Sequence, residues 1–279
     1  MKAILVPTAA HDMMDSVLET ALLAARRFDA YVEGFAIRPL ITEYVPVDMV
    51  GGLTWTRDDL TDEQAVRQSR DTFDRFMANR GVRPFEQQGA GPGYGWLENA
   101  NAGDTFVSSH ARIFDMTVLG RPTSGHAEPS MATLEAVLFE SGRPILIAPP
   151  TAPTKLGETI AIAWNGSTET ARATAFAMPL LKQAARVVVI TIDGGPLHQG
   201  PPGQELVRTL RLNGVAAEAS TYKVERRSTG ETLLKVSASL GVDLLVKGAY
   251  TQSRLRQMIF GGTTSHILAE ATLPVFMAH

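Results

Sequence analysis

Apolar runs and stretches of helical periodicity alternate along the 279 residues of this chain. An apolar run at residues 3–7 is followed by a stretch with helical spacing from about 15 to 27, and then by a second apolar run at 31–37. Nearly continuous apolar runs are typical of strands that are buried on both faces, and the helical stretches are typical of helices that cover a sheet. The pattern therefore predicts an α/β fold with parallel sheets.

The same order of elements returns in the second half of the chain, which indicates an internal repeat. The repeated elements are a strand at 159–164, a helix at 167–185 and a strand at 186–192.

Each half also ends in the same way, with two further apolar runs. The run at 114–120 resembles that at 242–248, and the run at 141–148 resembles that at 271–278. A short helix precedes the first run of each pair and is opened by similar phrases, Gly103-Asp-Thr-Phe and Gly230-Glu-Thr-Leu.

We therefore expect two domains, at residues 1–150 and 151–279. The segment at 149–153, Pro-Pro-Thr-Ala-Pro, is expected to be a stiff, extended linker between them.

The first half differs from the second by added segments. An insertion with prolines and glycines spans 38–56, and a charged stretch with helical spacing follows at about 58–79. The glycine-rich segment at 88–95 is interpreted as a flexible loop. The alternatives are a lid over a site, or an interdomain contact through Trp55 or Trp96.

Composition excludes several classes of protein. The net charge of −3 argues against a general binder of nucleic acid or membrane surfaces, because no broad basic field is present. The absence of cysteine excludes disulfides, thiolate chemistry and cysteine metal sites, and the six histidines show no metal-ligand spacing. The apolar run at the N-terminus is too short for a signal peptide or membrane span, so no membrane partner is expected. The absence of cysteine makes a cytoplasmic location the expectation.

The most informative segment lies between residues 243 and 277. An apolar run ends at Gly248, a polar loop carries Arg254 and Arg256, and Gly261-Gly262-Thr263-Thr264 then opens a helical pattern. A strand, a glycine loop and a helix N-terminus in this order favour an anion, because free backbone N–H groups and the helix dipole attract negative charge. Phosphate is the usual occupant of such a place.

This segment resembles the universal stress protein family. Nucleotide-binding members of that family carry Gly, two residues, Gly, nine residues and then Gly-Ser/Thr after the fourth strand. Gly248 and Gly261 match the first and third positions at the right spacing. Thr251 replaces the second glycine, and Gly262 stands where Ser or Thr is usual, with Thr263 and Thr264 following as hydroxyl donors.

The resemblance covers nearly the whole chain and implies the tandem form of the family. Each domain would be an open, Rossmann-like parallel sheet of strand order 3-2-1-4-5, with the ligand at the switch point between strands 1 and 4. The implied ligand is ATP or another adenine nucleotide, with or without Mg²⁺, in a stress-response regulator with an unidentified protein partner. The last strands of the two domains are expected to pair as an intramolecular pseudo-dimer, which makes a homodimer optional.

The predicted site lies in the second half. Asn165 follows the first strand where ATP-binding members carry Asp; the alternative role of this loop is a turn, with Ser167 as a helix cap. Arg254 is a candidate phosphate contact or part of a solvated loop face, and Lys247 is expected to point to solvent. The predicted ligand contacts are Ala163, Trp164, Asn165, Ile192, Val246, Gly248, Arg254, Gly261, Gly262, Thr263 and Thr264.

The corresponding loop of the first half is expected to be degenerate for a triphosphate. It lacks the glycine pair, carries Glu128, and is stiffened by Pro122 and Pro129, which donate no N–H.

No catalytic constellation stands out, so we predict a binder rather than an enzyme, although the family implies slow ATP hydrolysis in some members. The alternative is a tandem scaffold that binds a protein partner or a small apolar ligand instead of a nucleotide.

Overall fold

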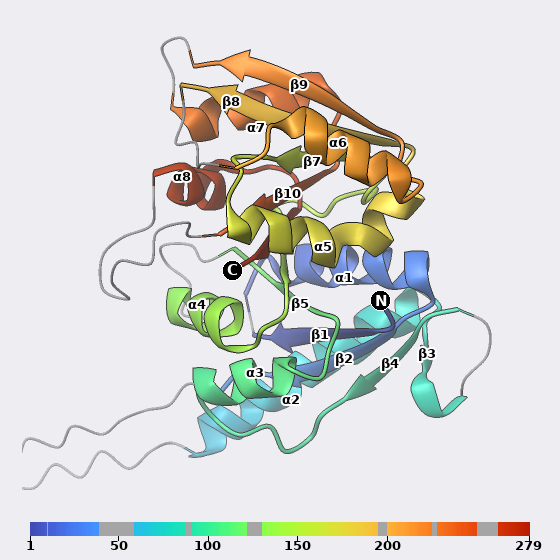
Figure 1. Ribbon diagram of the computed structural model, residues 1–279. Helices are drawn as coiled ribbons and strands as arrows, with labels where there is room; N and C mark the ends of the chain where they lie inside the picture. Colours follow the sequence, from blue (N-terminus) through green and yellow to red (C-terminus); the bar gives the residue numbers. More distant parts are fainter. Residues whose placement is uncertain are drawn as a thin grey trace, which may run out of the picture.

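The computed structural model describes residues 1–9, 11–38, 59–87, 91–121, 130–194, 200–224, 228–249 and 262–279. In these residues the strands form one open, twisted sheet of 11 strands with helices on both faces (Figure 1). The α/β fold class predicted from the sequence is therefore confirmed.

The two halves have elements in similar order. Those of the first half are β1 (Ala3–Thr8), α1 (Met14–Phe28), β2 (Tyr31–Ala36), α2 (Asp59–Asn79), β3 (Arg83–Pro84), a 3-10 turn η1 (Phe85–Gln87), β4 (Gly93–Trp96), α3 (Asp104–Ala111), β5 (Met116–Leu119), α4 (Met131–Glu140) and β6 (Ile145–Ile147). Those of the second half are β7 (Thr159–Ala163), α5 (Thr168–Gln183), β8 (Arg186–Asp193), α6 (Gly203–Leu212), β9 (Ala217–Lys223), α7 (Thr229–Ser239), β10 (Leu244–Gly248), α8 (Gly262–Glu270) and β11 (Val275–Ala278).

The strand order across the sheet is β3-β4-β2-β1-β5-β6-β11-β10-β7-β8-β9. Within the second half, this places β9, β8, β7, β10 and β11 side by side in the order 3-2-1-4-5, and the first half has the same order with β3 added at its edge. Each half therefore has a switch point between its first and fourth strands, as predicted, and the one in the second half lies between β7 and β10.

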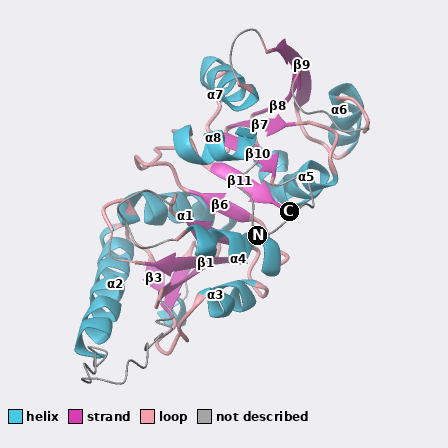
Figure 2. Ribbon diagram, turned by 90° about the vertical axis from the view of Figure 1, so that its left-hand side faces the viewer, coloured by secondary structure: helices cyan, strands magenta, loops and turns pink. Residues whose placement is uncertain are grey.

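Helices from both halves cover each face of the sheet. One buried apolar cluster joins the sheet to α1, α2, α5 and α6, and the other joins it to α3, α4, α7 and α8. Figure 2 shows this layered arrangement from the side. Within the part of the chain that the structure describes, no helix has the length and apolar character needed to cross a membrane.

The halves meet through their last strands. β6 and β11 pair in antiparallel fashion, with Ile147 opposite Val275 and Ile145 opposite Met277, whereas every other strand pair is parallel among the described strands. The predicted pairing of these two strands is confirmed, and it removes an exposed edge from each half. The helices α1 and α5 also lie side by side across this junction (Figure 1), where Arg27 donates to the carbonyl oxygen of Gln183 at 2.9 Å.

The interpretation of residues 88–95 as a flexible loop is wrong for its second part, because Gly93–Trp96 forms strand β4 and pairs with β2. A glycine at position 95 leaves room for Tyr31, because a Cβ there would lie 2.3 Å from the phenolic oxygen of Tyr31. Trp96 packs against Phe73 of α2, with ring centroids 5.6 Å apart, so its contact is within the first half rather than between domains. Trp55 lies outside the described residues.

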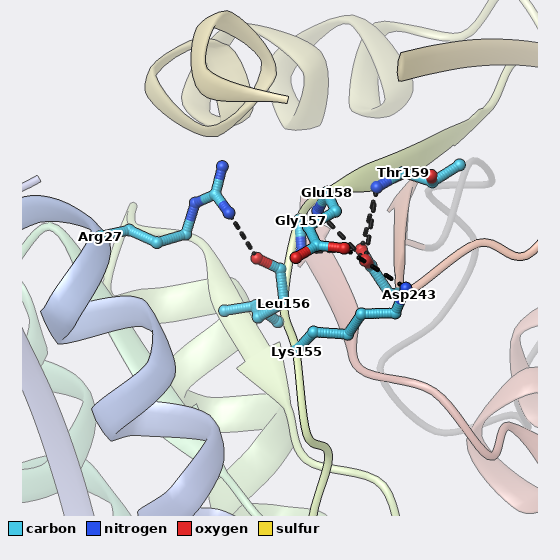
Figure 3. Close-up of polar contacts among 7 residues, drawn as sticks. All are labelled: Arg27, Lys155, Leu156, Gly157, Glu158, Thr159 and Asp243. Atoms are coloured by element: carbon cyan, nitrogen blue, oxygen red, sulfur yellow. Dashed lines mark hydrogen bonds and ion pairs between the residues drawn. The ribbon is translucent and has the colours of Figure 1, made fainter. Parts of the chain in front are cut away.

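The linker is fastened where it enters the second half (Figure 3). The carboxylate of Asp243 accepts the backbone N–H groups of Gly157 at 2.7 Å and Glu158 at 3.1 Å, and that of Thr159 at 3.3 Å. Arg27 of α1 donates to the carbonyl oxygen of Leu156 at 2.9 Å. The start of the first strand of the second half is thus bound both to its own domain and to the first half.

Candidate functional site

The central strands of the second half end side by side, which creates the edge where a ligand is expected. Lys247 near the end of β10 lies opposite Ala163 at the end of β7, and α5 and α8 begin just beyond this edge. In open α/β sheets the crevice at such a switch point is the usual ligand site. The sequence prediction of a site between these strands therefore agrees with the topology.

The loop after β7 is filled by protein. Trp164 is only 7% exposed, and its indole N–H donates to the carbonyl oxygen of Pro201 at 2.8 Å. Gly200 lies against Gly166 so closely that a Cβ on Gly200 would be 2.3 Å from the carbonyl oxygen of Gly166. The segment that leads into α6 therefore covers the side chain of Trp164.

Asn165 acts as a local turn and helix cap. Its side-chain oxygen accepts the N–H of Ser167 at 3.1 Å and the hydroxyl of Thr170 at 2.8 Å, while Ser167 caps α5 by accepting the N–H of Thr170 at 3.2 Å. The turn-and-cap role considered for this loop is confirmed. A contact between Asn165 and a ligand stays a prediction.

The residues expected to border the adenine lie at strand ends, but most of them belong to the hydrophobic core. Val246 is fully buried and Ile192 is 6% exposed, whereas Ala163 is partly exposed. Val246 packs with the α1/α5 side of the sheet and Ile192 with the opposite side. Their burial is explained by the core alone, and their contact with a ligand stays a prediction.

Gly248 is required by packing. It is buried at the end of β10, and a Cβ there would lie 2.4 Å from the backbone nitrogen of Thr170 and 2.6 Å from the carbonyl carbon of Glu169. The first turn of α5 thus sits directly on this glycine. The first glycine of the motif has a structural reason that needs no ligand.

Lys247 is buried, so the expectation that it points to solvent is wrong. Its side chain is 5% exposed and lies on the face of β10 that the helices α7 and α8 cover. Its ammonium donates to the carbonyl oxygen of Gly248 at 2.8 Å and to the hydroxyl of Thr264 at 2.9 Å. Burial lowers the pKa of Lys247 to about 7, because desolvation disfavours the charged form.

The first turn of α8 is open on one side. Gly262 is exposed, and a Cβ placed on it would meet no atom of the described residues within 4 Å. Thr263 is partly exposed, and Thr264 is buried against Lys247. The predicted contacts Gly261 and Arg254, and the positions Thr251 and Arg256, lie outside the described residues.

The two helix N-termini at this edge differ in charge. α5 carries Glu169 in its first turn, whereas α8 has no acidic residue there. Burial would raise the pKa of Glu169, but hydrogen bonds, including one from the Thr168 hydroxyl, outweigh it and hold that pKa below its ordinary value. Since a carboxylate already occupies the positive end of the α5 dipole, an anion is favoured at α8 instead.

The matching edge of the first half carries an acid. The hydroxyl of Thr133 in the first turn of α4 donates to the carboxylate of Asp104 at 2.6 Å, and Ser130 caps α4 by accepting the N–H of Thr133 at 3.0 Å. Glu231 occupies the corresponding position in the first turn of α7, so this acid does not distinguish the two edges, and the degeneracy of the first site stays a prediction. Glu128, Pro122 and Pro129 lie outside the described residues.

The fold therefore defines a tandem α/β protein in which each half is an open parallel sheet with a switch point between its first and fourth strands. Residues 158–279 match the model of the universal stress protein family. Universal stress protein Slr1230 of Synechocystis sp. is 25% identical over 173 residues, which cover 58% of this chain and 57% of that protein, so the chain matches little more than half of its relative's length.

Among solved structures, a universal stress protein from Archaeoglobus fulgidus has the same fold with a TM-score of 0.73 and 15% identity, covering 99% of this chain and 95% of the other. A functionally unknown protein from Pseudomonas aeruginosa PAO1 has a TM-score of 0.56 and 13% identity, covering 100% and 92%.

Residues 158–279 therefore match the universal stress protein family, and the first half of the chain repeats the fold of that segment.

Proposed function

We propose that the second half binds an adenine nucleotide, ATP or AMP, and that the protein acts as a stress-response regulator whose state depends on this ligand. The observation that carries the proposal is the open first turn of α8 at the switch point between β7 and β10. The first N–H groups of a helix and the positive end of its dipole meet there, the turn carries no acid, and none of the described residues lies within 4 Å of where a Cβ of Gly262 would be.

The residues at this edge fit a phosphate group. Gly262 presents bare backbone, the partly exposed Thr263 offers a hydroxyl, and Lys247 supplies a cation behind the turn. Within the described ranges no group of three His, Cys, Asp or Glu side chains could hold a metal ion. Any Mg²⁺ is therefore proposed as a companion of the phosphates rather than as a resident of the protein.

The division into a nucleotide-binding domain at 151–279 and a degenerate domain at 1–150 is part of this proposal. The sequences at the two helix starts support it, because the second half has Gly261-Gly262-Thr263-Thr264 where the first half has Ser130-Met131-Ala132-Thr133 and no glycine pair.

The position of Trp164 favours a second candidate function, a scaffold that binds no nucleotide, because its side chain fills the loop after β7. Its indole is covered by the segment from Gly200 to Gly203, and this region would have to admit or border an adenine ring. In that case the fold is a tandem scaffold for a protein partner or an apolar ligand.

Calorimetric titration of the full chain with ATP and AMP tests the proposal, with Gly262→Val as the key variant. Space around Gly262 predicts that the fold tolerates the substitution, whereas the added side chain blocks close approach of a phosphate. We expect the affinity for ATP to fall by at least tenfold while thermal unfolding stays within a few degrees of the parent.

Gly214→Val is the matched control, since a Cβ there also meets nothing but the residue lies in the turn after α6, away from this edge. Gly214 has a positive φ, so Gly214→Val is expected to lower the stability of the protein but to leave its affinity for nucleotide unchanged. A wild-type protein that binds neither nucleotide would favour the scaffold.

A further inference from the structure

Lys247 is a buried cation without a counter-charge. It is 5% exposed, and its two acceptors, the carbonyl oxygen of Gly248 and the hydroxyl of Thr264, are both neutral. An ammonium has three N–H donors, and within the described part of the chain the third has no acceptor and no carboxylate forms an ion pair with Lys247. Buried charges are normally paired, so the charged form of Lys247 is unfavourable here unless an anion binds beside it, and the side chain otherwise tends to lose its proton.

Burial alone accounts for the lowered pKa of this side chain. Among the described residues no charge contributes to it. The ionisable residues on the helices around this edge and at the end of the chain are Glu169 on α5, Glu231 and Lys235 on α7, His266 and Glu270 on α8, and His279. With a pKa of about 7, the group changes protonation near neutral pH, so an arriving anion can draw a proton onto it.

The first half shows that the fold does not need this polar pair. In the sheet, Leu119 of β5 occupies the place of Lys247 of β10. Leu119 pairs with Ile147, the third residue of β6, and Lys247 pairs with Met277, the third residue of β11. Counting back from the following prolines, Leu134 occupies the place of Thr264. Both leucines are fully buried in the same apolar cluster. An apolar pair is therefore sufficient for packing here, and the second half carries a lysine and a hydroxyl in its place.

We propose that Lys247 is the counter-charge for a phosphate group bound at the first turn of α8, and that Thr264 holds its ammonium there. The inference deepens the proposed nucleotide site and rests on it. Thr264 is the third residue of α8, so its bond to Lys247 joins the end of β10 to the turn whose N–H groups face the ligand. The lysine selects ligands that carry phosphate over the bare nucleoside.

The test compares wild-type protein with Lys247→Met, an unbranched apolar replacement, in titrations of the full chain with ATP, AMP and adenosine. We expect Lys247→Met to lose at least tenfold in affinity for ATP and AMP and to bind adenosine as before. We also expect wild-type protein to take up a proton on binding AMP near pH 7, measured in buffers of different ionisation enthalpy, and the variant to take up less. Unchanged affinity for ATP and AMP in Lys247→Met would overturn the inference.

A second variant guards against a folding defect. Lys247→Leu combined with Thr264→Leu copies the first-half pair, so it is expected to fold and to lose phosphate binding in the same way. If this double variant binds AMP as wild type does, the lysine is only structural.

Failure of the proposed function gives a different result. If wild-type protein binds none of the three ligands, the nucleotide proposal fails, and titration with inorganic pyrophosphate then decides the inference alone. Binding of pyrophosphate by wild type and not by Lys247→Met supports the anion site; no binding by either overturns it.

Discussion

At the scale of single residues, two equivalent aspartates fix the starts of the central strands. Asp115 accepts the backbone N–H groups of Lys2 and Ala3, and Asp243 accepts those of Gly157, Glu158 and Thr159. Each carboxylate thus binds N–H groups at the start of the first strand of its half. Hydrogen bonds to a charged group contribute about 1.5–3 kcal/mol each, so these contacts are substantial.

The two aspartates are expected to respond to pH in opposite directions. Burial would raise the pKa of Asp115, but the N–H groups of Lys2 and Ala3 outweigh it and lower that pKa. Burial raises the pKa of Asp243 despite its three N–H partners. The stabilisation from ionised Asp115 is therefore present above the unfolded pKa, about 3.9, and is lost as pH falls, whereas ionising Asp243 costs stability as pH rises.

Urea unfolding of Asp115→Asn and Asp243→Asn between pH 3 and pH 7 measures this. The destabilisation by Asp115→Asn should reach about 1–3 kcal/mol near pH 7 and shrink below about pH 4. The destabilisation by Asp243→Asn should instead be larger at low pH than at pH 7. Parallel pH profiles for the two variants would show that one of the directions is wrong.

Single residues were the hardest level to predict from the sequence. The cap at Asn165 and Ser167 followed from local chemistry, since both side chains bind backbone within a few positions. The burial of Lys247 did not, because it depends on which helices cover β10. The signal was present in its neighbours: a lysine inside an apolar run of a central strand has no solvent-facing side to occupy.

At the scale of elements, Gly248 and Gly262 of the glycine motif have different structural roles. Gly248 has a backbone atom of α5 2.4 Å from where its Cβ would lie, whereas no described residue lies within 4 Å of the corresponding position at Gly262, the start of α8. The first is needed to let a helix approach a strand, and the second leaves backbone accessible. The spacing of the glycines in the sequence does not distinguish these two roles.

Gly248→Ala should destabilise the protein by about 1–3 kcal/mol, because the added methyl group must displace the first turn of α5. Gly262→Ala should change the free energy of unfolding by less than about 1 kcal/mol, since no described residue lies within 4 Å of where its Cβ would be. Chemical unfolding of both variants checks this pair. Equal stability of the two would mean that the close approach at Gly248 relaxes without cost.

Elements with long apolar runs were predicted well, and short or polar ones were not. β1, β7, β8 and β10 fall where the apolar runs lie, because burial on both faces leaves a continuous signal. β4, with the sequence Gly-Tyr-Gly-Trp, has two glycines that favour a turn interpretation. Its place in the sheet comes from packing of Tyr94 and Trp96 against Phe73, which no local pattern contains.

At the scale of the whole molecule, the repeat determines the architecture. Two sheets of the same order join edge to edge, and the antiparallel pairing of β6 with β11 relates the halves by an approximate twofold. Phe139 of α4 and His279 also meet across the junction, with ring centroids 4.6 Å apart. The repeat and its junction were predictable because both last runs are short and apolar and would otherwise be exposed edges.

The junction predicts how the halves behave when they are separated. Residues 151–279 alone would expose the edge of β11, which in the intact chain pairs with β6 over Val275, Phe276 and Met277. We expect this half to form a dimer through β11, because a twofold contact offers the same antiparallel pairing to a second copy. Light scattering after size exclusion measures the mass.

Mixing the half at 1–150 with the half at 151–279 provides the control. If β6 and β11 recognise each other, the mixture should give a one-to-one complex at the expense of the dimer, because the native pair also recovers the contacts of Arg27 with Leu156 and Gln183. A second half that stays monomeric with a protected β11 edge, or that ignores the first half, would contradict this account of the junction. The same titration, repeated with ATP, would measure how strongly ligand binding at α8 depends on the partner strand beside β11.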